Sequence, residues 1–183
     1  MYGCALWNIK EVDTDFRQFM FKWYQGMIHG NTVISHFGEN VDRRCTFCKI
    51  TVKGTLARML GREPTEGEMN AEIINDENRI HIFWECDTVS RTYTDVFNGV
   101  WETNAVLDKK HFLMGKLILC AEVTQLYMLI NMYIKYRIWK YKLANTKPST
   151  NNIINDTKYF IQGLVAYNKW RIMLPLLRQH VRV

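Results

Sequence analysis

Three cysteines and one histidine, arranged in two clusters, constrain the fold of this chain more than any other feature. Cys45 and Cys48 form a Cys-x2-Cys pair, and His81 and Cys86 begin and end the string His-Ile-Phe-Trp-Glu-Cys. Three thiolates and one imidazole are the donors of a closed tetrahedral zinc site, because Zn²⁺ prefers sulfur and nitrogen ligands. We therefore predict a structural Zn²⁺ site with these four ligands and no position left for a catalytic water.

The two half-sites of this predicted centre are far apart in the sequence. Thirty-two residues separate them, so the rest of the fold must bring the four ligands together. His29 and His36, just upstream of the first pair, remain alternative ligands. The competing interpretation is that the cysteines are small buried apolar residues, and it suits Cys4 and Cys120 better than the clustered cysteines.

The composition is typical of a globular chain with one sizeable core. Hydrophobic residues make up 48% of the 183 residues, which is enough to bury such a core. An odd number of cysteines does not indicate a disulfide framework, so we expect a reducing, intracellular location in the nucleus or cytoplasm. The apolar run at 117–134 approaches the length of a membrane span, but polar residues interrupt it. We predict a buried helix there and no membrane partner.

Hydrophobic periodicity predicts a mainly α-helical single domain over residues 1–183. An N-terminal helix is expected at 13–30, with Asp13 or Thr14 as its cap, Gly30 as its stop, and an aromatic face that packs into the core rather than stacking on bases. The zinc knuckle spans 41–88. The helical C-terminal part, with its basic tail, spans 89–183.

An acidic insertion at 61–78 separates the two halves of the zinc knuckle. Its charge predicts a solvated loop that repels nucleic acid; a magnesium site is the alternative, although nothing in the sequence fixes the geometry of the acids. The other predicted elements are a helical turn at 56–60, a short helix at 65–74, an amphipathic helix from Val89 to Trp101, a long central helix at 117–143, and a last helix that begins at Ser149 or Thr150 and buries Ile153, Thr157, Phe160, Ile161 and Leu164.

Positive charge is concentrated near the C-terminus. Residues 135–183 contain ten Lys or Arg residues and one acid, whereas residues 1–134 contain fourteen bases and seventeen acids. Such a segment attracts an anionic partner, and RNA or DNA is the obvious one because phosphates bind cations independently of base sequence. The predicted nucleic-acid-binding residues are Lys135, Arg137, Trp139, Lys140, Lys142, Lys147, Lys169 and Arg171.

Residues 133–142 interleave these bases with aromatic rings. This mixture is typical of surfaces that bind single-stranded nucleic acid, where bases stack on rings and cations follow the phosphates. The alternative is the end of a buried helix, in which the rings belong to the core and the lysines extend outward to solvent.

The order of these motifs resembles that of a known family. The segment Phe21–Gly30, the Cys-Thr-Phe-Cys half-site, the string His-Ile-Phe-Trp-Glu-Cys, the segment Phe112–Lys116 and the Tyr/Lys-rich stretch through Pro148 resemble the C-terminal zinc-binding (CCHC) region of non-LTR, LINE-like retrotransposon reverse transcriptases. The resemblance covers residues 14–173. It implies that the clustered cysteines and histidine are zinc ligands, and that the domain follows a polymerase thumb and helps to hold template RNA and target DNA.

The resemblance does not extend to polymerase chemistry. The chain has no adjacent pair of aspartates, which the motif Tyr/Phe-x-Asp-Asp requires, and its gap between half-sites is longer than is usual in the family. Phosphate loops of the Gly-x4-Gly-Lys type, Gly-x-Ser-x-Gly elbows and His-Glu-x-x-His pairs are also absent. We therefore expect a non-catalytic domain that is part of a larger reverse transcriptase, a partner of one, or a stand-alone derivative.

An assembly protein is the alternative from a different functional class. In that case the apolar, aromatic-rich helices form an interface with other protein subunits in a ribonucleoprotein or virus-like particle, and some bases meet an acidic partner chain. Salt separates the two hypotheses, because nucleic-acid binding weakens steeply as the salt concentration rises. Association through an apolar patch does not.

Overall fold

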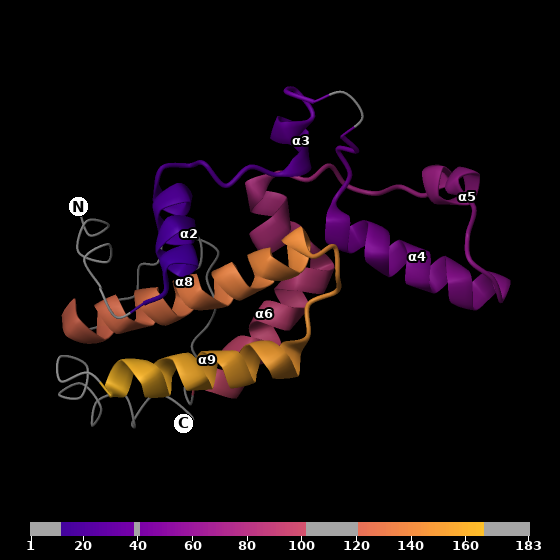
Figure 1. Ribbon diagram of the computed structural model, residues 1–183. Helices are drawn as coiled ribbons and strands as arrows, with labels where there is room; N and C mark the ends of the chain where they lie inside the picture. The colour runs from indigo at the N-terminus through magenta and orange to yellow at the C-terminus, as the bar shows by residue number, and fades with distance from the viewer. Residues whose placement is uncertain (1–11, 39–40, 102–120, 167–183) are drawn as a thin grey trace. The chain divides into compact units, whose positions relative to one another are not determined.

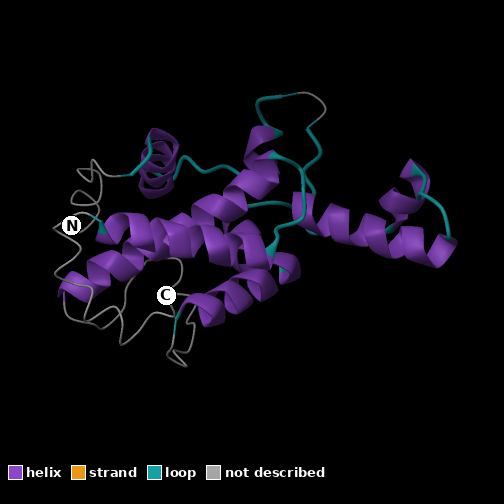
Figure 2. Ribbon diagram, turned by 60° about the horizontal axis from the view of Figure 1, so that its bottom comes forward, coloured by secondary structure: helices purple, strands orange, loops and turns teal. Residues whose placement is uncertain are grey.

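The computed structural model describes residues 12–38, 41–101 and 121–166. Across these ranges the chain is mainly α-helical, as the sequence predicted (Figure 2), and an isolated antiparallel bridge joins Arg44 and Asp76. The helical elements are α2 (Thr14–Tyr24), α3 (Asn31–Ile34), α4 (Thr46–Leu60), α5 (Glu66–Ala71), the π-helical turn η1 (His81–Glu85), α6 (Asp87–Val100), α8 (Ala121–Leu143) and α9 (Thr150–Val165) (Figure 1). Within the same ranges, no helix has the length and apolar character needed to cross a membrane.

The chain divides into two compact units. Of the described residues, unit 1 contains 12–27, 92–101, 121–138 and 149–166, and unit 2 contains 28–38, 41–91 and 139–148. The boundaries fall inside α6 and α8, so each of these helices contributes residues to both units. Periodicity identifies an amphipathic helix but does not reveal which helices share a core, and this is why the division was not predicted.

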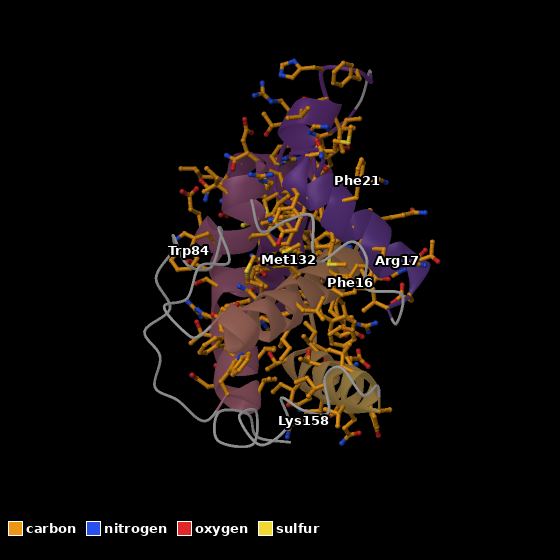
Figure 3. All side chains as sticks on the ribbon, turned by 90° about the vertical axis from the view of Figure 1, so that its left-hand side faces the viewer. Phe16, Arg17, Phe21, Trp84, Met132 and Lys158 are labelled. Carbon is orange, nitrogen blue, oxygen red and sulfur yellow. The ribbon has the colours of Figure 1, made fainter. Side chains whose placement is uncertain are left out.

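Aromatic rings form much of the core of unit 1. The buried residues of α2, Phe16, Phe19, Met20 and Trp23, are four of the five residues of the predicted apolar face. The fifth, Met27, lies beyond the end of the helix and is exposed. The ring of Phe16 packs edge-on against Tyr133 and Phe160, with centroid separations of 5.3 and 5.5 Å, and the latter two rings stack at 4.1 Å. Figure 3 shows Phe16 and Met132 among the packed side chains, whereas Phe21 points outward from α2.

The sequence predicted the start of α2 correctly but not its end. Asp13 caps the helix by accepting a hydrogen bond from the backbone N–H of Phe16 at 2.8 Å. The helix ends at Tyr24 and not at Gly30, because Gly26 adopts a left-handed conformation with φ of 72°. The Gly26 and Met27 N–H groups then donate to carbonyls of the last turn, a glycine-based helix stop.

The helices that follow confirm some of the predicted elements and extend others. On α9, Ser149 provides the predicted cap, and Ile153, Thr157, Ile161 and Leu164 are buried while Phe160 is half-buried. The short helix predicted at 65–74 is α5, and it folds back beside α4 (Figure 1). Only a turn at 56–60 was predicted where α4 extends over fifteen residues. This helix buries Phe47 alone, so it has no continuous apolar stripe from which periodicity could identify it.

Candidate metal centre

Cys45, Cys48, His81 and Cys86 lie together in unit 2 and form a group that can hold a metal ion. Their ligand atoms all lie within 4.8 Å of one another. The Cys48 Sγ atom is 3.4 Å from His81 Nε2 and 3.7 Å from Cys86 Sγ, and the Cys45 and Cys86 Sγ atoms are 3.9 Å apart. All three cysteines are free thiols. The structure therefore brings together the four residues that the sequence selected.

The first half-site is built by the start of α4. Cys45 precedes the helix in an extended conformation, with φ of −62° and ψ of 126°, and its carbonyl accepts the N–H of Lys49 at 2.9 Å. Cys48 lies in the first helical turn. The Cys-x2-Cys spacing thus places one sulfur at the cap and the other one turn along the helix, where both can face the same ion.

The second half-site depends on a π-helical turn. His81 begins η1, Cys86 follows it directly, and the Cys86 N–H donates to the His81 carbonyl at 2.8 Å. In an α-helix, residues five positions apart would point about 140° away from each other, since each residue turns the helix by about 100°. The wider π turn brings them to the same side, and π turns often occur at functional sites. As predicted, Cys86 lies at the N-terminus of a helix, α6.

A short return segment, residues 75–78, closes the long gap between the half-sites. The Cys45 N–H donates to the Asn75 carbonyl at 2.8 Å, and the Glu77 N–H donates to the Arg43 carbonyl at 2.8 Å. These bonds flank the isolated β bridge between Arg44 and Asp76. After α4 and α5, the return segment thus lies beside the first half-site, and the second half-site follows it directly in the sequence.

The return segment carries a buried carboxylate. Glu77 is completely buried, and its Oε1 and Oε2 atoms accept the backbone N–H groups of Asn31 at 3.1 Å and Thr46 at 2.8 Å. Lys142 Nζ forms an ion pair with it at 3.0 Å. The prediction that the acidic insertion is wholly solvated is therefore wrong for Glu77, because charge in a sequence does not reveal which acid has buried donors.

Hydrogen bonds among the ligands shift their proton affinities. Hydrogen bonds from the Cys45 thiol and with Cys48 hold the pKa of Cys86 far below its usual value, while hydrogen bonds with Cys48 and Cys86 raise the pKa of Cys45. The sulfurs of Cys48 and Cys86 raise the pKa of His81 to about 10. A metal ion needs thiolates and a neutral imidazole, so metal binding to this cluster releases protons and weakens as the pH falls.

The alternative ligands do not join the cluster. His29 and His36 are exposed and lie outside the group of four. Cys4 and Cys120, predicted to be buried apolar residues, lie outside the described residues. In the described part of the chain, the acids of the insertion form no further group with metal-binding geometry, so the magnesium alternative gains no support there.

The predicted nucleic-acid-binding residues occupy dissimilar environments. Lys140 and Lys147 are exposed, Arg137 and Trp139 are half-buried, Lys135 and Lys142 are buried, and Lys169 and Arg171 lie outside the described residues. The Lys135 ammonium lies 4.7 Å from the centre of the Trp23 ring. In this conformation the two buried lysines are not accessible to phosphate. Aromatic and basic residues that alternate along a helix do not specify which of the bases reach solvent.

Two further predicted contact residues pair within the protein. Arg137 forms an ion pair with Asp156 in unit 1, and the Trp139 ring stacks on Phe83 in unit 2 at a centroid distance of 6.3 Å. Phe83 belongs to η1, so Trp139 supports the turn that carries two of the candidate ligands. Sequence reasoning identified Trp139 as a stacking residue but could not identify its protein partner.

Comparisons of the chain with models of protein families, with curated proteins and with solved structures find no match. The resemblance to the C-terminal region of retrotransposon reverse transcriptases therefore rests on the sequence motifs.

Proposed function

We propose that this chain is a zinc-stapled, non-catalytic nucleic-acid-binding domain, with Zn²⁺ bound by Cys45, Cys48, His81 and Cys86. The observation that carries the proposal is the geometry of the four donors, whose ligand atoms all lie within 4.8 Å of one another. With zinc–sulfur bonds of about 2.3 Å and a zinc–nitrogen bond of about 2.05 Å, a tetrahedral site has sulfur–sulfur edges of about 3.8 Å and sulfur–nitrogen edges of about 3.6 Å. Three of the six edges of this cluster, at 3.7, 3.9 and 3.4 Å, are close to these values.

The donor set also favours zinc over the other common ions. Calcium and magnesium take oxygen ligands, and three thiolates with one imidazole are a typical set for structural zinc. Four protein ligands fill the tetrahedron and leave no position for a substrate or a water. The role proposed for the ion is therefore to tie the start of α4 to η1 and α6, which it would stabilise together.

The nucleic-acid part of the proposal is supported by charge and by the family resemblance. Lys140 and Lys147 are exposed in unit 2, and the C-terminal segment is strongly basic. The region that the chain resembles holds template RNA and target DNA beside a polymerase. We therefore propose RNA or DNA as the ligand and a reverse transcriptase polymerase region as a protein partner.

Elemental mass spectrometry of the chain purified without chelator tests the zinc proposal. We expect one zinc ion per chain, loss of the ion in Cys86→Ser, and retention in Cys4→Ser, which changes a cysteine that is not one of the four proposed ligands. A wild-type chain without zinc, or a Cys86→Ser variant that keeps it, would contradict the proposal.

Fluorescence anisotropy with labelled single-stranded RNA and DNA tests the second part. The affinity should fall steeply with salt, and Lys140→Gln with Lys147→Gln should reduce the salt slope by about 1.4, since each phosphate contact on a single strand contributes about 0.7. Lys22→Gln, an exposed lysine on α2, is the matched control. Absence of binding to either nucleic acid at low salt would overturn this part and leave the zinc result intact.

A second candidate function, assembly with other protein subunits, has an observation in its favour. Several large apolar side chains of unit 2 are exposed, among them Phe37 at 87%, Met59 at 77% and Ile73 at 97%. Exposed apolar surface is typical of interfaces. Sedimentation velocity at low and high salt distinguishes the candidates, because self-association that persists at high salt favours assembly.

A further inference from the structure

We propose that Glu77 is a positioning residue for the metal centre: its buried carboxylate sets the geometry of the Cys-x2-Cys half-site, and Lys142 holds the carboxylate in place. This inference rests on the metal-binding function proposed above and assigns a role to two residues that are not ligands.

Helix α4 has no side chain of its own that caps its N-terminus. The residue at the cap position is Cys45, whose side chain belongs to the ligand cluster and makes no capping hydrogen bond. The first N–H of the helix, that of Thr46, instead donates to Glu77 Oε2 at 2.8 Å, from 31 residues along the chain. A carboxylate at this end of a helix satisfies an unpaired donor and complements the helix dipole.

This contact acts directly on the half-site. Cys45 is held on both sides, because its own N–H donates to Asn75 and the next N–H donates to Glu77. Both partners belong to the return segment. The peptide groups that orient the two sulfurs of the half-site are thus fixed by residues 75–77, as second-layer hydrogen bonds orient ligands in metal sites generally.

The same segment also holds the second half-site. Asn78, the residue after Glu77, accepts the His81 N–H on its side-chain oxygen at 2.8 Å and the Ile82 N–H on its carbonyl at 2.9 Å. Glu77 therefore contacts the first half-site, and the residue that follows it contacts the second. A shift of this carboxylate would change the position of one half-site relative to the other.

The carboxylate needs a partner because it is completely buried. Lys142, near the end of α8, provides the charge at 3.0 Å and is itself only 7% exposed. Its Nζ atom also lies 3.3 Å from Asn31 Oδ1 and 4.6 Å from the centre of the Trp139 ring. Removal of the lysine would leave a buried charge without its partner, which is much more costly than removal of both charges.

The Glu77 carboxylate links the metal centre to α8. Metal binding and the docking of the last turn of α8 within unit 2 depend on this carboxylate, so each should strengthen the other. Lys142, which the sequence assigned to nucleic acid, would then contribute to metal affinity.

Titration with Co²⁺ and competition with Zn²⁺ test the proposal in the full-length chain. Co²⁺ reports the geometry of the site through its visible absorption, and a chromophoric chelator gives the Zn²⁺ dissociation constant. We expect Glu77→Gln and Lys142→Met each to weaken Zn²⁺ binding 10- to 100-fold. Each should also alter the visible spectrum of the Co²⁺-saturated protein. Glu72→Gln, an exposed acid on the same insertion, should change neither quantity.

The double variant Glu77→Gln with Lys142→Met separates positioning from general stabilisation. It should lose less affinity than the two single losses combined, because neither charge is left buried alone. A residue that contributed only stability would lower the melting temperature and leave the spectrum of the saturated protein unchanged. Additive losses with an unchanged spectrum would therefore overturn the proposal.

The remaining outcomes distinguish this inference from the function on which it rests. A wild-type chain that binds neither Zn²⁺ nor Co²⁺ would overturn both. Tight wild-type binding, with Glu77→Gln unchanged in affinity and spectrum, would overturn only the role of Glu77. If Glu77→Gln fails to fold, Lys142→Met decides, and wild-type affinity and spectrum in that variant would contradict the proposal.

Discussion

The two units of the chain are stabilised in different ways. Unit 1 buries a network of aromatic rings on α2, α8 and α9, together with aliphatic side chains of α6 and α8. In unit 2, the described residues that are buried include few large apolar side chains, among them Ile28, Phe47, Ile82, Phe83 and Val89. Three of the candidate metal ligands, Cys45, His81 and Cys86, are buried with them, as are Glu77 and Lys142, whereas Cys48 is half-buried. Where apolar burial is small, directed polar contacts supply more of the stability, and an ion bound to the cluster would add to it.

The two buried lysines of α8 show what the units share and where the described contacts differ. Lys135, in unit 1, lies over the ring of Trp23, and Lys142, in unit 2, lies over the ring of Trp139. These residues are seven positions apart on one helix. Each ammonium group thus packs on an indole ring of its own unit, and Lys142 in addition pairs with the Glu77 carboxylate.

Loss of the metal should destabilise unit 2 far more than unit 1. In Cys86→Ser, or after chelation, we expect amides of unit 2 to lose their protection from hydrogen exchange while amides of unit 1 remain protected. Zinc contributes about 10–16 kcal/mol to the folding of small zinc domains, more than most domains have as net stability. Exchange measured by mass spectrometry distinguishes the units. Equal loss of protection in both would show instead that they unfold as one.

Truncation of a core ring should destabilise unit 1 and leave the metal centre of unit 2 intact. Phe16→Ala removes a completely buried ring from unit 1, so we expect it to lower the free energy of unfolding by about 3–5 kcal/mol. The metal content should not change. Phe21→Ala, on the exposed side of the same helix, is the control and should cost less than about 0.5 kcal/mol. Loss of metal in Phe16→Ala would contradict the independence of the two units.

The sequence predicted the Cys/His cluster because zinc chemistry restricts both residue type and spacing. Cys45, Cys48, His81 and Cys86 could be selected without knowing the fold, and the aromatic stripe of α2 and the cap at Ser149 follow from helical geometry. Each half-site, the stripe and the cap is recognised from residues that are close in sequence, and only the joining of the two half-sites needs the fold.

The features that were not predicted depend on distant partners. Nothing in the sequence distinguishes Glu77 from the solvated acids near it, because its burial depends on donors from α3, α4 and α8. The π turn between His81 and Cys86 has no periodicity of its own from which it could be predicted. The length of α4 was missed because the helix packs little apolar surface.

A glycine in unit 2 offers a smaller and more local test. A Cβ atom at Gly30 would lie 2.2 Å from the Glu77 carbonyl oxygen, and the backbone on both sides would have to move. We expect Gly30→Ala to destabilise unit 2 by about 1–3 kcal/mol. Gly54→Ala, in the middle of α4 with no atom near the added carbon, should stabilise it by about 0.5–1 kcal/mol. Urea unfolding of the metal-bound protein measures both, and equal effects would contradict the close packing around Glu77.

The smallest effect is expected from protonation of Glu68 at the start of α5. Its exposed capping box with Thr65 makes no contact with the buried pair Glu77 and Lys142 among the hydrogen bonds described. Glu68 accepts the Thr65 N–H at 2.7 Å and pairs with Arg62 at 2.6 Å, and these contacts lower its pKa from 4.5 to about 2. The carboxylate therefore stabilises the start of α5 fully above pH 4.5, and this contribution is lost as the pH falls through about 2.

The pH dependence of the Thr65 amide signal in NMR spectra tests this independence. Protons compete with a metal for thiolates at higher pH, so the cluster should release its ion before the capping box opens. Two separate titration steps would show that α5 is held locally, and Glu68→Gln would then remove only the lower step. A single step shared with metal release would instead place α5 in the network that the metal stabilises, and unit 2 would be cooperative beyond its buried residues.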